Sequence, residues 1–342
     1  MTNPFILSGK WFKGSLHCHT TNSDGILSPT EVLRKYRDNG YDLVAVTDHG
    51  KVTPLVREHE NLLPIPGEEL SVGTSKAGES YHIVGVGIEG DLGKGFVGPE
   101  AVEEAVEAIT ESGGLAFIAH PYWSGLVTED IVRVKGHCGI EIFNTGCESE
   151  VGKGFSTVHW DQVLSLGEMI NGIAVDDAHR YLYPPYDAMG GWVWVKADEL
   201  NQKSITKALR EGSFYSSMGP EIKLVEIGGT LRVKCGGVKK ISMISHNGTG
   251  IVFDYPTVKG IVEAWKSGEK ADGTISDVEV GEVGSAVETK ITLRNGRRLR
   301  GVSSNGTMTE AECDLELFNR YVRIEVVDVE NRKAWTNPMF LK

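Results

Sequence analysis

The sequence contains no apolar run long enough to cross a membrane as a helix, and this predicts against an integral membrane protein. The first residues, MTNPFILSGKWFKGS, hold too short an apolar stretch for a secretory signal, so we expect a cytoplasmic protein. Close pairs of cysteine are also missing. The chain has five cysteines, Cys18, Cys138, Cys147, Cys235 and Cys313. This pattern favours reduced thiols, with an intermolecular disulfide as the alternative.

Basic residues are scarce relative to acidic ones. The chain has 35 lysines and arginines against 47 aspartates and glutamates, which gives a net charge of −12. A polyanion needs a basic surface to displace its counterions, so we expect neither a nucleic-acid polymer nor a membrane among the partners. A small phosphorylated molecule remains compatible with this charge, because bound metal can make a site locally positive.

What the chain does contain, up to residue 219, is an alternation of strand-like and helix-like segments. Apolar runs such as DLVAVT have the length of buried strands, and residues 100–112 form a strongly amphipathic helix. We expect leading strands near residues 16, 44, 63, 117, 141, 172 and 215. Such β/α alternation predicts a parallel sheet, and it favours a distorted (β/α)7 barrel, similar to a TIM barrel, over an open doubly wound sheet.

The pattern changes after Gly219. Short strands follow one another with Asn-Gly turns at Asn247, Asn295 and Asn305, and no comparably strong helix is visible. We therefore divide the chain into an α/β domain, residues 1–219, and a smaller all-β domain, residues 220–342, predicted to be an antiparallel sandwich. No catalytic cluster is visible in the second domain, so we interpret it as a structural or interaction domain through which a homo-oligomer could form.

The stretch GSLHCHTTNSD holds the densest group of metal-ligand side chains. In a strand, His17 and His19 point to one face while Cys18 points to the other. Asp24 follows in a turn-rich segment that can bring its carboxylate to the same space. Two satisfied histidines beside an ordinary turn are the alternative interpretation.

Later segments supply the same residue types near the ends of predicted strands. Because active sites of barrels form at the C-terminal ends of their strands, these side chains should converge. Charged groups do not gather there without a compensating cation, and nine ligands exceed the four of a tetrahedral ion. We therefore expect two or three divalent ions of zinc, manganese or iron, held by His17, His19, Asp24, His49, Glu69, His82, His120, Asp177 and His179.

The ordered motifs LHCHT, SDG, TDHG, PGEEL, AHP and DAH, with His82 on an extended strand, resemble those of the PHP (polymerase and histidinol phosphatase) superfamily of metal-dependent phosphoesterases. The match covers about residues 13 to 218. The resemblance implies a barrel of seven β/α units with up to three ions. It also selects Glu69 over Glu68, and Asp177 over Asp176.

Carried over residue by residue, the resemblance implies three ligand sets, of which the first two share Glu69 as a bridge. The third-site position is often histidine in the family, and aspartate stands there in this chain. The implied sets are His17, His19, Glu69 and Asp177 for one ion, His82 and His120 with Glu69 for a second, and Asp24, His49 and His179 for a third.

The expected activity is hydrolysis of a small phosphorylated molecule, either nucleotide-like or a sugar phosphate, by a hydroxide that bridges two ions. We assign catalytic roles to His179 and to Arg180, which follows it and could pair with a phosphate. Further substrate contacts are predicted for Lys51, Tyr122 and Trp123. The chain has no Gly-x-Ser-x-Gly elbow, and its cysteines are expected to lie off the site, with Cys18 pointing away from it, so serine or cysteine hydrolysis is disfavoured.

Two alternatives remain. The same metal cluster could cleave a carboxylester, carbamate or amide, because the end of the first domain, GGWVWVKADEL to GSFYSSMGP, looks like a branch of such metallohydrolases. A non-catalytic metal-binding scaffold is the other alternative. Ligand sets that leave open positions on the metal disfavour it, since a structural site has no need of them.

Overall fold

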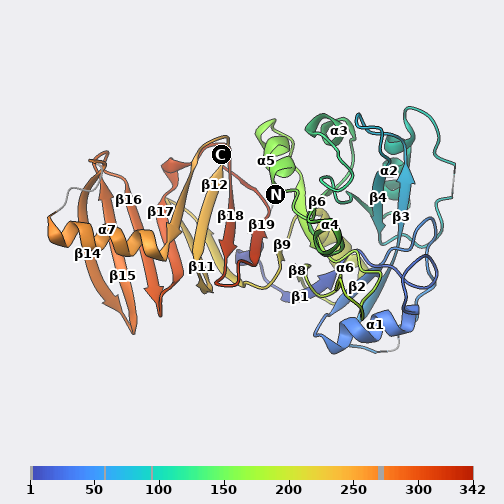
Figure 1. Ribbon diagram of the computed structural model, residues 1–342, viewed down its shortest axis with the longest axis horizontal. Coiled ribbons are helices and arrows are strands. Elements are labelled where there is room, and N and C mark those ends of the chain that lie inside the picture. The colour runs from blue at the N-terminus through green and yellow to red at the C-terminus, as the bar shows by residue number, and fades with distance from the viewer. Residues whose placement is uncertain (1–2, 58, 94, 269–272, 342) are drawn as a thin grey trace. The chain divides into compact units, whose positions relative to one another are not determined.

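The computed structural model describes residues 3–57, 59–93, 95–268 and 273–341 of the chain (Figure 1). These residues form two compact units. The first contains Ser8–Ser216, and the second contains Phe5–Leu7 and the residues from Ser217 onward. Each unit buries apolar side chains of its own.

The first unit is built on a sheet whose strand order is β9-β8-β1-β2-β3-β4-β5-β6-β7. Most of these strands are buried along their whole length, as expected of strands covered on both faces. Their bounds are β1 Lys10–Ser15, β2 Leu43–Val46, β3 Leu63–Val72, β4 Tyr81–Val86, β5 Leu115–Ile118, β6 Gly139–Asn144, β7 Asn171–Val175, β8 Trp192–Ala197 and β9 Phe214–Ser217.

A regular (β/α)7 barrel is not confirmed. Strands β1, β2 and β3 are parallel, and so are β5, β6 and β7, but β4 is antiparallel to both β3 and β5. Strand β8 is likewise antiparallel to β1. The ends of the strand order meet through one side chain, because Ser216 Oγ of β9 donates to Gly172 O and accepts from Ala174 N of β7 at 2.8 and 3.0 Å. The result is a mixed sheet rather than seven equivalent parallel units.

Helices that lie between these strands in the chain pack against the sheet. Helix α1 begins with a capping box, in which Ser28 Oγ accepts from Glu31 N and Glu31 Oε2 accepts from Ser28 N. Its buried face, which includes Val32 and Tyr36, packs on Val44 of β2. The helices of this unit are α1 Pro29–Asp38, α2 Ala101–Glu111, α3 Thr128–Arg133, α4 Thr145–Val151, α5 Thr157–Ser165 and α6 Gln202–Arg210.

The second unit consists mainly of antiparallel strands in two groups. One has the order β13-β12-β18-β19 with β20 on β18, and the other has the order β10-β11-β17-β16-β15-β14. The groups contact each other through apolar side chains, since Met243 Sδ of β12 and Cys313 Sγ of β17 lie 3.3 Å apart. The strands are β10 Ile222–Ile227, β11 Thr230–Val238, β12 Lys240–Ser245, β13 Gly250–Asp254, β14 Ile275–Val283, β15 Ala286–Leu293, β16 Arg298–Ser304, β17 Thr307–Asp314, β18 Tyr321–Val327, β19 Lys333–Thr336 and β20 Met339–Phe340.

The prediction of an all-β second domain is wrong in one respect, because helix α7, Tyr255–Ser267, follows β13. Its local signals are a proline in the first turn and a C-cap glycine, Gly268, in the left-handed conformation with φ 77°. Val258 is its buried apolar residue, and Trp265 remains 37% exposed. Its apolar residues Val258, Ile261, Val262 and Trp265 recur at the helical spacing i, i+3, i+4 and i+7, so the sequence does carry a helix signal here, although the helix buries little apolar surface. Two short 3-10 helices, η1 Pro4–Ile6 and η2 Leu315–Leu317, complete the described elements.

No helix in the described ranges is both long and apolar enough to span a membrane. All five cysteines are free thiols.

Candidate metal centre

The nine candidate ligands meet at one edge of the first unit's sheet. Most follow a parallel strand, and His82 enters from the start of β4. Because β4 runs antiparallel to its neighbours, its N-terminal end lies at the edge where the parallel strands have their C-terminal ends. The positions are His17, His19 and Asp24 after β1, His49 after β2, Glu69 within β3, His82 in β4, His120 after β5, and Asp177 and His179 after β7.

His17 and His19 face each other across the start of this edge. Their Nε2 atoms are 3.1 Å apart, and both rings are fully buried. Cys18 points the other way, where its Sγ donates to Ala45 O at 3.3 Å in the core. Cys18 is therefore outside the donor cluster.

The first donor group brings two imidazoles and two carboxylates together. Asp177 Oδ1 lies 3.2 Å from His17 Nε2 and 3.1 Å from His19 Nε2. Glu69 Oε2 lies 3.2 Å from each of the same two nitrogens. One ligand atom from each of the four residues lies within 4.8 Å of the others, a spacing that can surround one ion.

The second group uses the other oxygen of the same glutamate. Glu69 Oε1 lies 2.8 Å from His82 Nδ1 and 3.5 Å from His120 Nε2. Glu69 therefore belongs to two donor groups, each through a different oxygen, as a bridging carboxylate requires.

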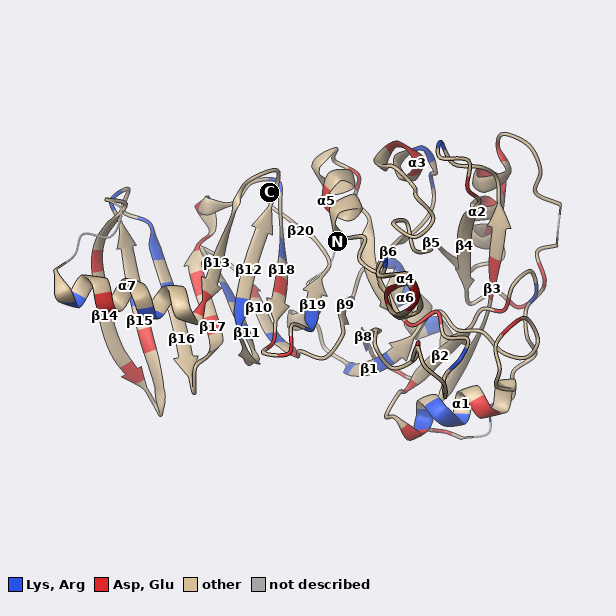
Figure 2. Cartoon of the chain, viewed as in Figure 1, with Lys and Arg blue, Asp and Glu red and all other residues tan. Residues whose placement is uncertain are grey.

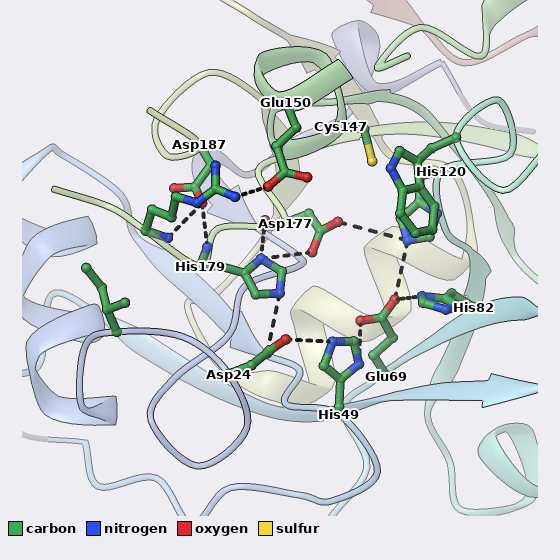
Figure 3. A pocket seen from close by; sticks show the side chains of 14 residues that line it. Asp24, His49, Glu69, His82, His120, Cys147, Glu150, Asp177, His179 and Asp187 are labelled. Carbon is green, nitrogen blue, oxygen red and sulfur yellow. Dashed lines mark hydrogen bonds and ion pairs between the residues drawn. The ribbon is translucent and has the colours of Figure 1, made fainter. Parts of the chain in front are cut away.

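The third group is more open to solvent. Asp24 has a side chain that is 56% exposed, and its oxygens lie 3.5 Å from His49 Nε2 and 3.4 Å from His179 Nε2 (Figure 3). His19 joins this group through Nδ1, at 3.8 Å from Asp24. The resemblance did not imply a role for His19 here.

The chemistry of these donors fits divalent cations. Glu69 Oε2 is buried and accepts no hydrogen bond in the structure as described, although three ring nitrogens surround it. His49 Nδ1 approaches it to 3.1 Å, in addition to His17 and His19. Neutral imidazole lone pairs and a carboxylate oxygen repel one another at such distances unless a cation or protons lie between them. The nitrogen and oxygen donors suit zinc, manganese and iron, and do not select one of them.

The cluster shifts the protonation of its members strongly. Burial by itself would lower the pKa of both histidines, but Asp177 and Glu69 raise that of His17 well above 6.5 and that of His19 to about 9. Burial favours neutral carboxyls, yet the imidazoles lower the pKa of Glu69 and of Asp177. The carboxylates are therefore held ionised in a buried place, where positive charge is required to balance them.

Two ligands sit on unusual backbone. His120 has φ 27° and Asp177 has φ 55°, in the left-handed region that non-glycine residues rarely adopt. The Asp177 segment is anchored by its neighbour, because Asp176 accepts from Tyr36 Oη at 2.9 Å and from Gly190 N at 2.9 Å. Such conformations persist where the surroundings over-determine them, and they concentrate at functional sites.

Sequence reasoning missed Glu141, a buried carboxylate of β6. Its Oε1 lies 2.6 Å from His17 Nδ1, and its Oε2 accepts from His120 N at 2.8 Å and from Asn144 Nδ2 at 2.9 Å. The same Asn144 amide donates to Asp177 Oδ2 at 3.1 Å. Glu141 thus orients ligands from several strands. A charged residue inside the apolar run GIEIFN was the signal that could have revealed it.

A cavity of about 450 Å³ opens beside the three groups (Figure 3). Arg180 lines it and pairs with Glu150 at its rim. Asp187 accepts from the backbone N–H groups of His179 and Arg180 at 2.8 and 2.7 Å, and so fixes this segment. Trp123 also lines the cavity, with its ring centroid 5.0 Å from that of His120.

Two other predicted substrate contacts lie elsewhere. Tyr122 is 44% exposed, and its ring lies 5.6 Å from Lys153 Nζ. Lys51 is half-buried in the loop after His49. Among the described residues that line this cavity, neither Tyr122 nor Lys51 appears, so their contact with a substrate stays a prediction.

Parts of this chain are similar in sequence to known proteins. No family model matches it. An uncharacterized protein of Methanocaldococcus jannaschii, MJ1587, is 31% identical over 121 residues, which are 32% of this chain and 68% of that protein. A 5'-3' exoribonuclease of Haemophilus influenzae is 37% identical over 81 residues, which are 22% of this chain and 29% of the enzyme.

Among solved structures, a two-domain protein of Bacteroides vulgatus containing a predicted PHP-like metal-dependent phosphoesterase is similar over 97% of this chain and 96% of that one, at 14% identity and a TM-score of 0.48. The assignment of this chain rests on its own motifs and on the archaeal relative. Its ordered ligand motifs fold into three donor groups, of which two share Glu69 and two share His19. The chain therefore belongs to the family of the Methanocaldococcus jannaschii protein, and its ordered ligand motifs resemble those of the PHP superfamily.

Proposed function

We propose that this chain is a metal-dependent phosphoesterase that hydrolyses small phosphorylated molecules. The observation that carries the proposal is the pair of donor groups joined by Glu69, buried at the wall of an open cavity. Two ions bridged by one carboxylate form the arrangement that many metallohydrolases use for phosphoryl transfer. Nitrogen and oxygen donors without thiolate suit such a catalytic role.

Divalent ions bound there would lower the pKa of a bound water and neutralise charge on a phosphoryl oxygen. His17, His19, Glu69 and Asp177 would hold the first ion, Glu69, His82 and His120 the second, and Asp24, His49 and His179 with His19 the third.

The chain's own residues have three tasks around these ions. Glu141 keeps His17 in one orientation by holding its Nδ1 at 2.6 Å, which turns Nε2 toward the donor group. Arg180 offers a guanidinium that can bind a phosphate oxygen on the cavity side. His179 directs Nδ1 to Asp177 O at 3.0 Å, which leaves Nε2 facing Asp24 and the third group.

The Haemophilus influenzae relative supports a phosphoester substrate, because an exoribonuclease by name cleaves phosphodiester bonds. This chain spans 29% of that enzyme's length. The net charge of −12 argues against a long RNA as the substrate of this protein. A small phosphoester satisfies both observations.

An activity screen tests the proposal. Protein loaded with zinc, manganese or iron should release p-nitrophenol from p-nitrophenyl phosphate or bis-p-nitrophenyl phosphate, and should leave naphthyl carbamate intact. Hydrolysis of the carbamate alone would contradict the proposal and favour the carbamate and ester class.

A matched pair of variants tests the role of the bridging carboxylate. Glu69→Gln should lower kcat by at least about a hundredfold, since the amide cannot bridge two cations. The adjacent Glu68 is buried but belongs to none of the three donor groups among the described residues, so Glu68→Gln should retain most activity. Equal activity of both variants would refute the assignment of Glu69.

A further inference from the structure

Three of the candidate ligands line two cavities. Besides the cavity of about 450 Å³ lined by Arg180, there is a second cavity of about 550 Å³. His49, Glu69 and His82 line both. A group bound at these three residues therefore borders both cavities.

The second cavity is fixed by hydrogen bonds at its two walls. In the wall made by β3 and β4, Ser71 Oγ lies 3.3 Å from His82 Nε2, while His82 Nδ1 faces Glu69. The segment that holds Gly93 and Phe96 forms another part of the lining. Leu92 N of that segment donates to Glu68 Oε2 at 3.1 Å, and Asp91 Oδ1 accepts from Val52 N at 2.6 Å.

The two cavities differ in charge. The first is lined by Arg180, Glu150 and Asp187 in addition to the ligands. In the second, the described lining residues other than the shared ligands are uncharged, and Leu70, Val72 and Phe96 supply its apolar surface. An uncharged lining with an aromatic side chain suits an uncharged planar substituent.

We propose that the substrate is a small phosphodiester that spans both cavities, with its scissile phosphate at the shared ligands and an uncharged aryl or nucleobase-like substituent against Phe96. This inference rests on the proposed phosphoesterase function and adds the substrate class. A phosphomonoester carries a single substituent and would leave one cavity unfilled. In the reaction, a water oxygen forms a new bond to phosphorus and one ester P–O bond breaks. One proton of the water passes to the leaving oxygen, which departs as an alcohol or phenol, and the other stays on the phosphomonoester product or passes to solvent.

Two diesters of equal charge and with the same leaving group provide the test. Bis-p-nitrophenyl phosphate carries a second aryl group, whereas methyl p-nitrophenyl phosphate carries a methyl group in its place. In metal-loaded full-length protein, Phe96→Ala should lower kcat/KM for the aryl diester about tenfold more than for the methyl diester, since the aryl group loses an aromatic contact. The intrinsic reactivity of each ester cancels when variant and wild type are compared.

Two further variants separate this role from a general effect on folding. Phe96→Tyr keeps the ring and should keep the wild-type ratio between the diesters. Val97 is the next residue, is 80% exposed, and Val97→Ala should leave both rates unchanged. Circular dichroism and metal content are measured for each protein.

The outcomes distinguish the two proposals. If Phe96→Ala hydrolyses both diesters with the wild-type ratio of kcat/KM, the proposal that the substrate spans both cavities is wrong, but the proposed phosphoesterase function is not contradicted. Failure of metal-loaded wild type to hydrolyse any phosphoester would overturn both.

Discussion

Glu141 shows how much a single buried side chain can organise in this site. Each of its oxygens is in use: Oε1 faces His17 Nδ1, and Oε2 accepts from His120 N and Asn144 Nδ2. A glutamine has one accepting oxygen, and its amide cannot accept a hydrogen from His17. The substitution therefore disturbs the orientation of at least one ligand without changing the size of the side chain.

We expect Glu141→Gln to weaken metal binding about 10- to 100-fold, because partners that orient ligand histidines have effects of this size. Isothermal titration with zinc or manganese measures the affinity, and circular dichroism checks that the fold is retained. Glu168→Gln is the control, since Glu168 makes a surface ion pair with Lys135. Unchanged metal affinity in Glu141→Gln would contradict the role of Glu141 in orienting the ligand histidines.

Arg180 is the second residue with a testable role, because it is already paired with Glu150 across the cavity rim. An anionic substrate must draw the guanidinium away from this carboxylate. Glu150→Gln should therefore lower KM for phosphoesters several-fold, and Arg180→Ala should raise it about tenfold. Steady-state kinetics on p-nitrophenyl phosphate give both values. The change in KM must have opposite signs in the two variants. A rise in KM for both would refute the idea that Glu150 and the substrate compete for Arg180.

At the scale of elements, the neighbouring strands β11, β17, β16 and β15 carry acidic and basic residues (Figure 2), several of which form ion pairs between strands. Glu310 is at its centre and is 8% exposed. It accepts from Arg232 Nε at 2.8 Å and from Arg300, which also pairs with Glu288. Burial raises the pKa of Glu310, but the hydrogen bonds from the two arginines lower it below 4.5 overall.

This lowered pKa predicts the pH dependence of stability. A carboxyl with a pKa lower in the folded than in the unfolded protein stabilises the fold above its unfolded pKa, and the stabilisation is lost as the pH falls through the folded pKa. Glu310→Gln should lower the free energy of unfolding by about 1 kcal/mol at pH 7. The difference from wild type should begin to shrink as the pH falls below about 4.5, the ordinary value for glutamate, and should disappear once the pH is below the lower pKa of the folded protein.

Urea unfolding of the full chain at pH 7 and at about pH 3 measures this difference. The exposed Glu282 of β14 provides the control variant, Glu282→Gln, which should match wild type at both values. An equal destabilisation by Glu310→Gln at both pH values would point to lost packing instead of lost charge.

At the scale of the whole molecule, all donor groups found among the described residues belong to the first compact unit. A ligand that binds only the folded state stabilises it by an amount set by its concentration relative to Kd. Removal of metal should therefore lower the stability of the first unit and leave the second unchanged.

Differential scanning calorimetry of the full chain, with metal and after chelation, tests this expectation. Chelation should lower one thermal transition by several degrees, about what a change of a few kcal/mol produces in a domain of this size, and added metal should restore it. A matching shift of both transitions, or of neither, would contradict a metal centre confined to the first unit.

Much of the local structure was predictable from neighbouring residues. Ser28 and Glu31 are three positions apart and make the cap of α1 by themselves, so the start of this helix is readable from sequence. The antiparallel run of β4 was not predicted. Strand direction depends on which distant segment a strand pairs with. A short apolar run has the same sequence pattern whether the strand pairs in parallel or antiparallel. Helix α7 was not predicted, although Val258, Ile261, Val262 and Trp265 recur at helical spacing, because the short strands and Asn-Gly turns around it favoured an all-β domain.

The sequence by itself determined which side chains are available as donors and the order in which the strands deliver them, since both are properties of short segments. Only the tertiary structure decided that the two oxygens of Glu69 serve different groups, that His19 reaches a third, and that Glu141 orients His17 from 124 positions away. The physical reason is that such contacts arise when distant strands pair in a particular register, which no local pattern specifies.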